Sequence, residues 1–233
     1  MKTVEEWSAE FDMLYNNITS NQAPGLTEYE KSKFLTDAQE AVVIMLYNGT
    51  ARNSFEETEE ITDYLSTLVR TADYNEARLS QVHTEISGGH KYDVPMPGDM
   101  MFRTLELCEL EIEGCDHMEA NVVPVTQDEF WRTKRNPFKK QNERKVLRLA
   151  YGEYANSISG NNKTDYSELY SEYPIEKYTV RYVKRPEPII LENLEDGLTI
   201  RGKSAASTCK LDESLHLTIL TEAVRMAKAV WTS

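Results

Sequence analysis

The chain has 233 residues, of which 40% are hydrophobic and 28% are charged, so it can bury a core of ordinary size. It contains no apolar run approaching the roughly 18 residues that a membrane-spanning helix needs. Acidic residues outnumber basic ones by 39 to 26, giving a formal net charge of −13. The absence of a long apolar run excludes a membrane protein, and the acidic net charge excludes a generally basic nucleic-acid binder.

Three helices are predicted in the first seventy residues. Each begins at a capping box, in which a hydroxyl accepts a hydrogen bond from the backbone N–H three residues later and a Glu side chain returns the bond. The pairs are Thr3 with Glu6, Thr27 with Glu30, and Ser54 with Glu57. Apolar residues recur at helical spacing after each box, and Pro24-Gly25 separates the first helix from the second. We therefore expect a helical region over about 1–70.

From about residue 71 the apolar spacing becomes that of strands. Residues 102–112 alternate apolar with polar, but the parity slips between Leu107 and Cys108. Either a β-bulge or two shorter strands would produce such a slip. Residues 145–151 and 178–183 are also predicted strands, because they alternate and are rich in β-branched or aromatic residues.

Two further segments of this region carry turn and loop signals. Residues 189–191 and 198–200 flank Asp196-Gly197, so a hairpin is expected there. Residues 156–174 are poor in aliphatic side chains and rich in Ser, Asn and Tyr. They predict a long surface loop.

Two more helices are expected in the second half of the chain. A short one begins at Thr126 and ends by Asn136, because Pro137 follows. A long one over 212–231 begins at Asp212 and carries an apolar arc wide enough to pack on two partners.

Together the elements predict an α+β fold, because strands and helices occur in separate runs. We expect a helical region, residues 1–70, packed beside an antiparallel sheet within a domain of residues 71–233, with the C-terminal helix laid across the sheet.

Charge is strongly segregated along the chain. Residues 1–130 hold 26 acids and 8 bases, whereas residues 131–148 hold 8 bases and a single acid, Glu143. The bases of this basic segment are Arg132, Lys134, Arg135, Lys139, Lys140, Arg144, Lys145 and Arg148. With Phe130, Trp131 and Phe138 interleaved, the segment could bind nucleic acid, dock onto an acidic partner such as a second copy of the chain, or be a solvated loop.

Signatures of catalysis are absent from the sequence. It has no phosphate-binding glycine loop, no G-x-S-x-G elbow, no H-E-x-x-H and no C-x-x-C pair. A carboxylate cluster, Glu106, Glu109, Glu111, Glu113 and Asp116, could hold Mg²⁺ in a nuclease, but it also fits the polar face of an exposed strand. The three cysteines favour free thiols in a reducing cytoplasm. We expect no enzyme activity, no metal and no cofactor.

Three stretches of the chain resemble a known family. They are 10-EFDMLYNNITSNQAPGLTEYEKSKFLTDAQEAVV-43, 180-VRYVKRPEPIIL-191 and 212-DESLHLTILTEAVRMAKA-229. They resemble virion structural proteins of crAss-like and related tailed bacteriophages, the small proteins that build rings between portal and tail. The closing helix also looks like that of many head–tail connectors. The family carries no catalytic residues to transfer.

The resemblance implies a multi-copy, twelvefold ring in the virion, assembled in the bacterial cytoplasm, that extends the DNA channel below the portal during DNA ejection. Its partners would be further copies of the chain and the neighbouring portal, connector and tail proteins, with DNA only as passing cargo and no membrane contact. In such a ring we expect the basic segment to dock onto an acidic face of the next subunit. We expect Val230 and Trp231 of the C-terminal helix to pack between subunits. The competing functions are a sequence-tolerant DNA-binding module and a metal-dependent nuclease.

Overall fold

The chain forms two compact units, seen here in a computed structural model. The structure describes residues 2–18, 25–48, 59–75, 79–82, 89–151, 166–195 and 197–232. The helical unit comprises Met1–Leu68 and Arg185–Ser233, and the sheet unit comprises Val69–Lys184. Residues 185–233, which the sequence assigned to the sheet domain, therefore belong with the N-terminal helices. The sheet unit is an insertion between the two chain segments that build the helical unit.

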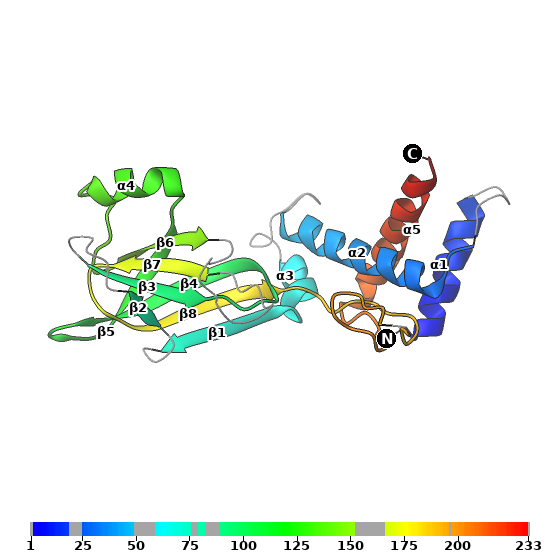
Figure 1. Cartoon of the computed structure of the whole chain (residues 1–233), viewed down its shortest axis with the longest axis horizontal. Helices are drawn as coiled ribbons and strands as arrows, with labels where there is room; N and C mark the ends of the chain where they lie inside the picture. The colour runs from blue at the N-terminus through cyan, green and yellow to red at the C-terminus, as the bar shows by residue number, and fades with distance from the viewer. Residues whose placement is uncertain are drawn as a thin grey trace. The chain divides into compact units, whose positions relative to one another are not determined.

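The helical unit is built from α1 (Val4–Ile18), α2 (Glu28–Tyr47), α3 (Glu59–Ser66), the 3₁₀ turn η2 (Glu213–Leu215) and α5 (His216–Thr232). Helix α5 packs against α2 and, over a smaller area, against α1 (Figure 1). The expectation that the C-terminal helix lies across the sheet is thus wrong, because its apolar arc is buried against other helices. The fully buried side chains include Trp7 and Phe11 of α1, Leu35 of α2 and Ile219 of α5.

The first two predicted capping boxes are confirmed. At the start of α2, the Glu30 N–H donates to Thr27 Oγ1 over 3.3 Å and the Thr27 N–H donates to the Glu30 carboxylate over 2.8 Å. Thr3 and Glu6 make the same reciprocal pair before α1. The third predicted box, Ser54 with Glu57, lies outside the described residues.

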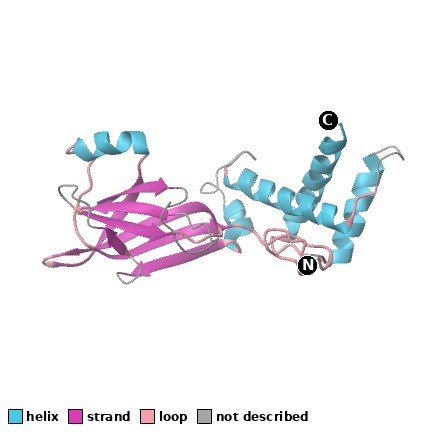
Figure 2. Ribbon diagram, viewed as in Figure 1, coloured by secondary structure: helices cyan, strands magenta, loops and turns pink. Residues whose placement is uncertain are grey.

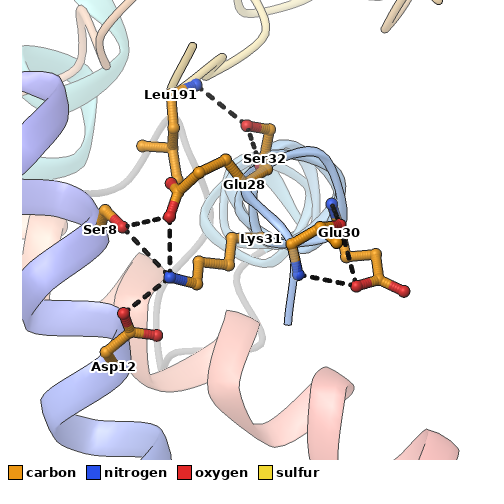
Figure 3. A network of polar contacts seen from close by, with 8 residues as sticks. Ser8, Asp12, Glu28, Glu30, Lys31, Ser32 and Leu191 are labelled. Atoms are coloured by element: carbon orange, nitrogen blue, oxygen red, sulfur yellow. Dashed lines mark hydrogen bonds and ion pairs between the residues drawn. The ribbon is translucent and has the colours of Figure 1, made fainter. Parts of the chain in front are cut away.

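A buried polar network joins α1 to α2 (Figure 3). The Lys31 side chain is only 4% exposed. Its ammonium lies 2.7 Å from Asp12 Oδ2 on α1 and 2.9 Å from Glu28 Oε1, and it donates to Ser8 Oγ over 3.2 Å. Burial alone lowers the pKa of Lys31, but the two carboxylates outweigh it and raise the pKa, so the pair of helices meets through a charged, fully bonded lysine.

The segment that leads from the sheet to η2 has little regular structure but is firmly held. Ser32 Oγ accepts the Leu191 N–H over 2.9 Å, and Thr36 Oγ1 both accepts from the Ile189 N–H and donates to the Ile189 carbonyl, each over 3.1 Å. The predicted hairpin at 189–200 does not form. Instead Ile190 bridges Ser207 and Ile200 bridges Lys203 across a tight turn at 201–202.

The turn at 201–202 explains why Ile200 pairs with Lys203, only three residues further along the chain. Arg201 has φ 52° and Gly202 has φ 75°. Two central residues with positive φ match the twist of a two-residue hairpin turn, and the glycine supplies the second of them without strain.

The sheet unit contains eight strands among the described residues (Figure 2). They are β1 (Val69–Asn75), β2 (Ser80–Val82), β3 (His90–Pro95), β4 (Met100–Ile112), β5 (Cys115–Pro124), β6 (Lys145–Tyr151), β7 (Tyr166–Ser171) and β8 (Ile175–Lys184). Their order is β1-β8-β4-β5-β6-β7-β3-β2, and every pair is antiparallel except β5 with β6. That parallel pair exists because the helix α4 (Gln127–Arg135) connects its two strands as a crossover. The predicted α+β class is confirmed.

The parity slip between Leu107 and Cys108 is neither a bulge nor a break between two strands. Both residues keep regular register against β5 and β8, with Leu107 on one face of the sheet and Cys108 buried on the other. The register of the single strand β4 shifts elsewhere, between Arg103 and Leu105 and between Glu109 and Leu110 against β8, and between Leu110 and Ile112 against β5. By contrast, β7 occupies 166–171 with five consecutive buried residues, so the surface loop expected over 156–174 does not extend that far.

The two faces of the sheet bury different cores. The larger core lies on the inner face and contains Tyr92, Leu110, Val146, Leu169 and Tyr178, contributed by β3, β4, β6, β7 and β8. A smaller core of Leu147, Leu149, Tyr170 and Phe130 lies on the opposite, outer face, beneath α4.

Candidate docking surface

Helix α4 is fixed to the outer face of the sheet by one aromatic side chain. Phe130 is buried against Tyr170 of β7, with ring centroids 4.5 Å apart, and against Leu147 and Leu149 of β6. Acidic residues fill the first turn of α4 and basic residues the last, which complements the helix dipole. The helix spans Gln127–Arg135 as predicted, although the Thr126 side chain makes no capping hydrogen bond.

The side of α4 away from the sheet presents exposed aromatic rings. Trp131 is 55% exposed and Phe138, in the following turn, is 90% exposed. They line an open hollow of about 640 Å³ together with Arg132, Arg135, Asn136 and Pro137. The Phe138 N–H donates to Asn136 Oδ1 over 2.9 Å, so the turn that carries this ring is ordered by its own hydrogen bonds. Two exposed rings in a cation-lined hollow are typical of a docking anchor.

Most of the basic segment is on the surface. Arg132, Arg135, Lys139, Lys140 and Arg144 are exposed, and Lys145 is half-buried. Lys140 lies 3.8 Å from Glu172 and Arg144 lies 3.9 Å from Glu143. Among the residues the structure describes, Arg132, Arg135 and Lys139 have no ion-pair partner. These three cations are available to a partner of opposite charge.

Lys134 has a different environment from the other bases. Its ammonium lies 5.9 Å from the centroid of Tyr170 and 6.0 Å from those of Phe130 and Trp131. Burial lowers its pKa. Because its ammonium lies over three rings at the contact between α4 and the sheet, this lysine is placed to stabilise that contact rather than to meet a partner.

Arg148, which the sequence placed in the docking set, does not reach the surface. Its side chain is 10% exposed, and its Nε lies 2.9 Å from Glu106 Oε2 on the inner face of the sheet. The Tyr178 hydroxyl donates to the other oxygen of Glu106 over 2.5 Å. Burial and the neighbouring Glu106 both raise the pKa of Tyr178, so the phenol stays protonated and donates. Arg148 therefore belongs to the interior of the sheet unit.

A second polar cluster beside α4 gave no recognisable signal in the sequence. Lys91 of β3 forms ion pairs with Glu168 of β7 and, at 3.5 Å, with Asp93, while the Tyr170 hydroxyl donates to Glu168 over 2.7 Å. Burial raises the pKa of Asp93. Sequence reasoning missed this cluster because residues 166–171 read as a loop, and only the β3–β7 register brings these side chains together.

Comparison with known proteins identifies the family. Residues 1–232 match the family described as phage tail ring protein 3/4. Ring protein 3 of Bacteroides phage crAss001 is 40% identical over 238 residues, which cover 97% of this chain and 94% of that protein. Ring protein 4/5 of the same phage is 32% identical over 235 residues, covering 98% and 93%. The chain belongs to the phage tail ring protein 3/4 family.

Membership in the ring protein family confirms the predicted resemblance to crAss-like virion structural proteins. It assigns the chain a structural role in a phage tail ring, and hence a place in the virion. Within the described part of the chain, none of the helices has the length and apolar content needed to span a bilayer.

In this ring protein the predicted carboxylate cluster does not converge. Glu106 points to the inner face and pairs with Arg148, whereas Glu109 lies 3.6 Å from Lys177 of β8. Glu111 and Glu113 are exposed, and the side chain of Asp116 is outside the described residues. Among the described residues no group of three or more His, Cys, Asp or Glu side chains could hold a metal ion.

The end of α5 is the second surface that the sequence assigned to packing between subunits. The arc formed by Leu215, Ile219, Leu220, Ala223, Val224 and Ala227 is buried within the helical unit. Val230, one turn further on, is 62% exposed. The backbone of Trp231 is helical, but its side chain lies outside the described residues.

Proposed function

We propose that this chain is a subunit of a closed, multi-copy ring at the junction of head and tail, where twelve copies extend the DNA channel below the portal. The observation that carries the proposal is the match to the ring family along 1–232. Its neighbours would be further copies of the chain and the adjoining portal, connector and tail proteins, after assembly in the bacterial cytoplasm.

The charge distribution supports a ring through which DNA passes without being held. The chain has a formal net charge of −13; five exposed bases lie close together in the basic segment, whereas the other eight in the described part of the chain are scattered. An acidic wall repels phosphate and lets DNA slide during ejection, whereas many phosphate contacts would bind it tightly and in a salt-dependent way.

Two surfaces would join the copies. The exposed bases of the basic segment dock onto an acidic face of the next subunit, with Trp131 and Phe138 as apolar anchors. The exposed end of α5, with Val230 and Trp231, packs against a neighbour beyond the helical unit's own core. Single exposed ion pairs are worth only about 0–1 kcal/mol, but their repetition around a closed ring would fix the register of the subunits.

The charge reversal of Arg135, Lys139, Lys140 and Arg144 to Glu tests this function against DNA binding. We expect the variant to fold but to be absent from purified virions, while wild-type protein shows no salt-sensitive binding to a labelled duplex. A sequence-tolerant DNA-binding module would instead bind the duplex at low salt and lose that binding in the variant. Cleavage of duplex DNA by the wild type with Mg²⁺ would favour the nuclease alternative.

Val230→Asp tests the second surface, with the exposed Thr218→Asp of the same helix as its matched control. We expect Val230→Asp to reduce incorporation into virions and Thr218→Asp to leave it unchanged. The mass of the released wild-type ring, measured by native mass spectrometry, tests the copy number. A monomeric mass from intact particles would contradict the ring.

A further inference from the structure

A row of carboxylates on the outer face of β4 and β5 is poorly compensated within the chain. Glu109 and Glu119 are direct cross-strand partners in the antiparallel pair, and like charges placed opposite each other destabilise a sheet. Lys177 pairs with Glu109 from the other side. Glu111, Glu113 and Glu119 are exposed and make no ion pair with any residue that the structure describes.

Apolar side chains continue this outer face beyond the carboxylates. Leu105 of β4 is opposite Arg181 of β8, and Leu107 is opposite both Thr179 of β8 and Asn121 of β5. Leu105 and Val123 are exposed large apolar side chains. Together Leu105, Leu107, Val123, Glu109, Glu111, Glu113 and Glu119 define what we term the acidic face. It combines an apolar strip with a row of carboxylates.

The basic hollow has the complementary composition. Trp131 and Phe138 supply exposed rings, while Arg132, Arg135 and Lys139 supply cations without ion-pair partners in the described chain. Hollow and acidic face lie in different parts of the sheet unit. Helix α4 packs on β6 and β7, whereas the carboxylates belong to β4, β5 and the turn between them. Figure 1 draws α4 and that hairpin turn apart. No ion pair joins these three cations to the four carboxylates within one copy.

We infer that the basic hollow of one subunit docks onto the acidic face of the next copy, with Arg132 and Arg135 paired to Glu111 and Glu119. The inference rests on the proposed ring and names the partner surface that the ring function leaves open. The occupant is a second copy because each copy carries both complementary surfaces at different places. Such a head-to-tail contact, repeated with a rotation that closes, builds the proposed ring. It also supplies the counter-charge that Glu119 lacks.

Reciprocal charge reversal tests the contact in virions produced with variant full-length chains. R132E/R135E and E111K/E119K are each expected to lower incorporation about tenfold or more, because like charges would face each other across the interface. The combined variant R132E/R135E/E111K/E119K restores the wild-type net charge of −13. It is expected to recover incorporation, because the contact is rebuilt with its signs exchanged.

The matched control is K33E/R70E, which reverses two exposed bases outside the basic segment and leaves both surfaces intact. Its incorporation is expected to equal that of the wild type. If the combined variant stays excluded while each variant keeps the circular dichroism spectrum of the folded chain, the basic hollow docks elsewhere and the inference is overturned. If incorporation is insensitive to every reversal, the inference is also overturned.

Cysteine pairing provides a second readout that separates this inference from the ring itself. In virions carrying K139C/E113C with the native Cys115 replaced by Ser, a short thiol crosslinker should give a ladder of chain multimers, whereas K139C or E113C alone in the same C115S background should give no ladder. If an amine-reactive crosslinker gives a ladder and the thiol crosslinker gives none, the copies form a multimer but the basic hollow does not contact the acidic face. This result would overturn the inference and leave the proposed ring in place. Loss of both ladders would contradict the proposed ring as well.

Discussion

The helical unit and the sheet unit use charge in opposite ways. The helical unit has one deeply buried cation, Lys31, whose partners Asp12 and Glu28 lie partly at the surface. The sheet unit buries the pair Arg148 and Glu106 at its inner face, whereas Arg132 and Arg135 of α4 and Lys139 of the following turn have no ion-pair partner among the described residues. In the helical unit the buried charge therefore joins two helices. In the sheet unit one ion pair stabilises the interior, and other bases remain available to a partner at the surface.

The units also differ in how the chain builds them. The sheet unit is one continuous stretch, but the helical unit requires both chain segments, 1–68 and 185–233. Variants that weaken one unit selectively can therefore test whether each has its own core, and the four below run from the largest expected effect to the smallest.

Phe11→Ala should have the largest effect, because Phe11 is fully buried in the helical unit. Removing a buried Phe leaves a cavity and costs about 3–5 kcal/mol of unfolding free energy. Hydrogen exchange should show the loss of protection first in the helical unit and not in 69–184. Met13→Ala, at an exposed position of the same helix, should change stability by about 0.5 kcal/mol or less. Equal loss of protection in both units would contradict separate cores.

Arg148→Met should weaken the sheet unit by about 3 kcal/mol, because it removes the nearer cation from the buried Glu106 carboxylate and leaves only Arg103 Nε, 3.9 Å away. Chemical denaturation with a probe in the sheet would measure this. Adding Glu106→Gln should recover part of the loss, since the buried carboxylate is then removed. The exposed control Arg144→Met should be close to neutral. A neutral Arg148→Met would instead show that the pair contributes nothing to stability.

Ser32→Ala should destabilise the helical unit by about 1–3 kcal/mol, because the buried Leu191 N–H loses its acceptor. The expected result is a lower denaturation midpoint and faster exchange of the Leu191 amide. Ser66→Ala, which removes an exposed hydrogen bond to the Asp63 carbonyl, should have a much smaller effect. Unchanged exchange at Leu191 would mean that the Ser32 hydrogen bond does not hold the two chain segments together, and that the Thr36–Ile189 hydrogen bonds and apolar packing do.

Acidification should produce the smallest change, and it should act on the helical unit. His216 is buried, its Nε2 lies 3.3 Å from the Leu211 carbonyl, and its ring is 5.0 Å from that of Trp7. Burial lowers its pKa below the ordinary 6.5. The imidazole of His216 therefore binds a proton more readily in the unfolded chain than in the folded one. The stability that neutral, buried His216 contributes is complete above pH 6.5 and declines as the pH falls below it. Between pH 7.5 and 5.5, the free energy of unfolding should fall more steeply with decreasing pH for the wild type than for His216→Gln. The same pH dependence in both proteins would exclude His216 as the source of the acid sensitivity.

The local structure was largely predictable from the sequence, whereas the placement of the closing helix was not. Capping boxes at Thr3 and Thr27 are short-range signals, and the structure contains them where the sequence indicated. The change of parity at Leu107 and Cys108, by contrast, did not locate the bulges of β4, which lie at other positions of the strand. That α5 packs on α2 depends on contacts between residues nearly two hundred positions apart, and an apolar arc fits a helix as well as a sheet.

The candidate surface shows the same division. The sequence located the basic segment and its aromatic residues, because charge and residue type are local properties. It also placed Arg148 on the surface, since a run of bases does not reveal which one turns inward. The alternation of β6 puts Arg148 on the same side as Val146, in the interior opposite Glu106. Only the pairing of distant strands could identify that partner.

The insertion of the sheet unit has a consequence for the order of events on the ribosome. Strands β1 to β8 emerge as one uninterrupted stretch and can fold before synthesis ends. Helices α1 and α2 emerge first, yet they cannot bury their apolar surfaces fully until α5 leaves the exit tunnel. At about 5–20 residues per second, the final segment follows the sheet by a few seconds. A prematurely terminated chain that lacks α5 therefore cannot complete the helical unit, even when its sheet unit is folded.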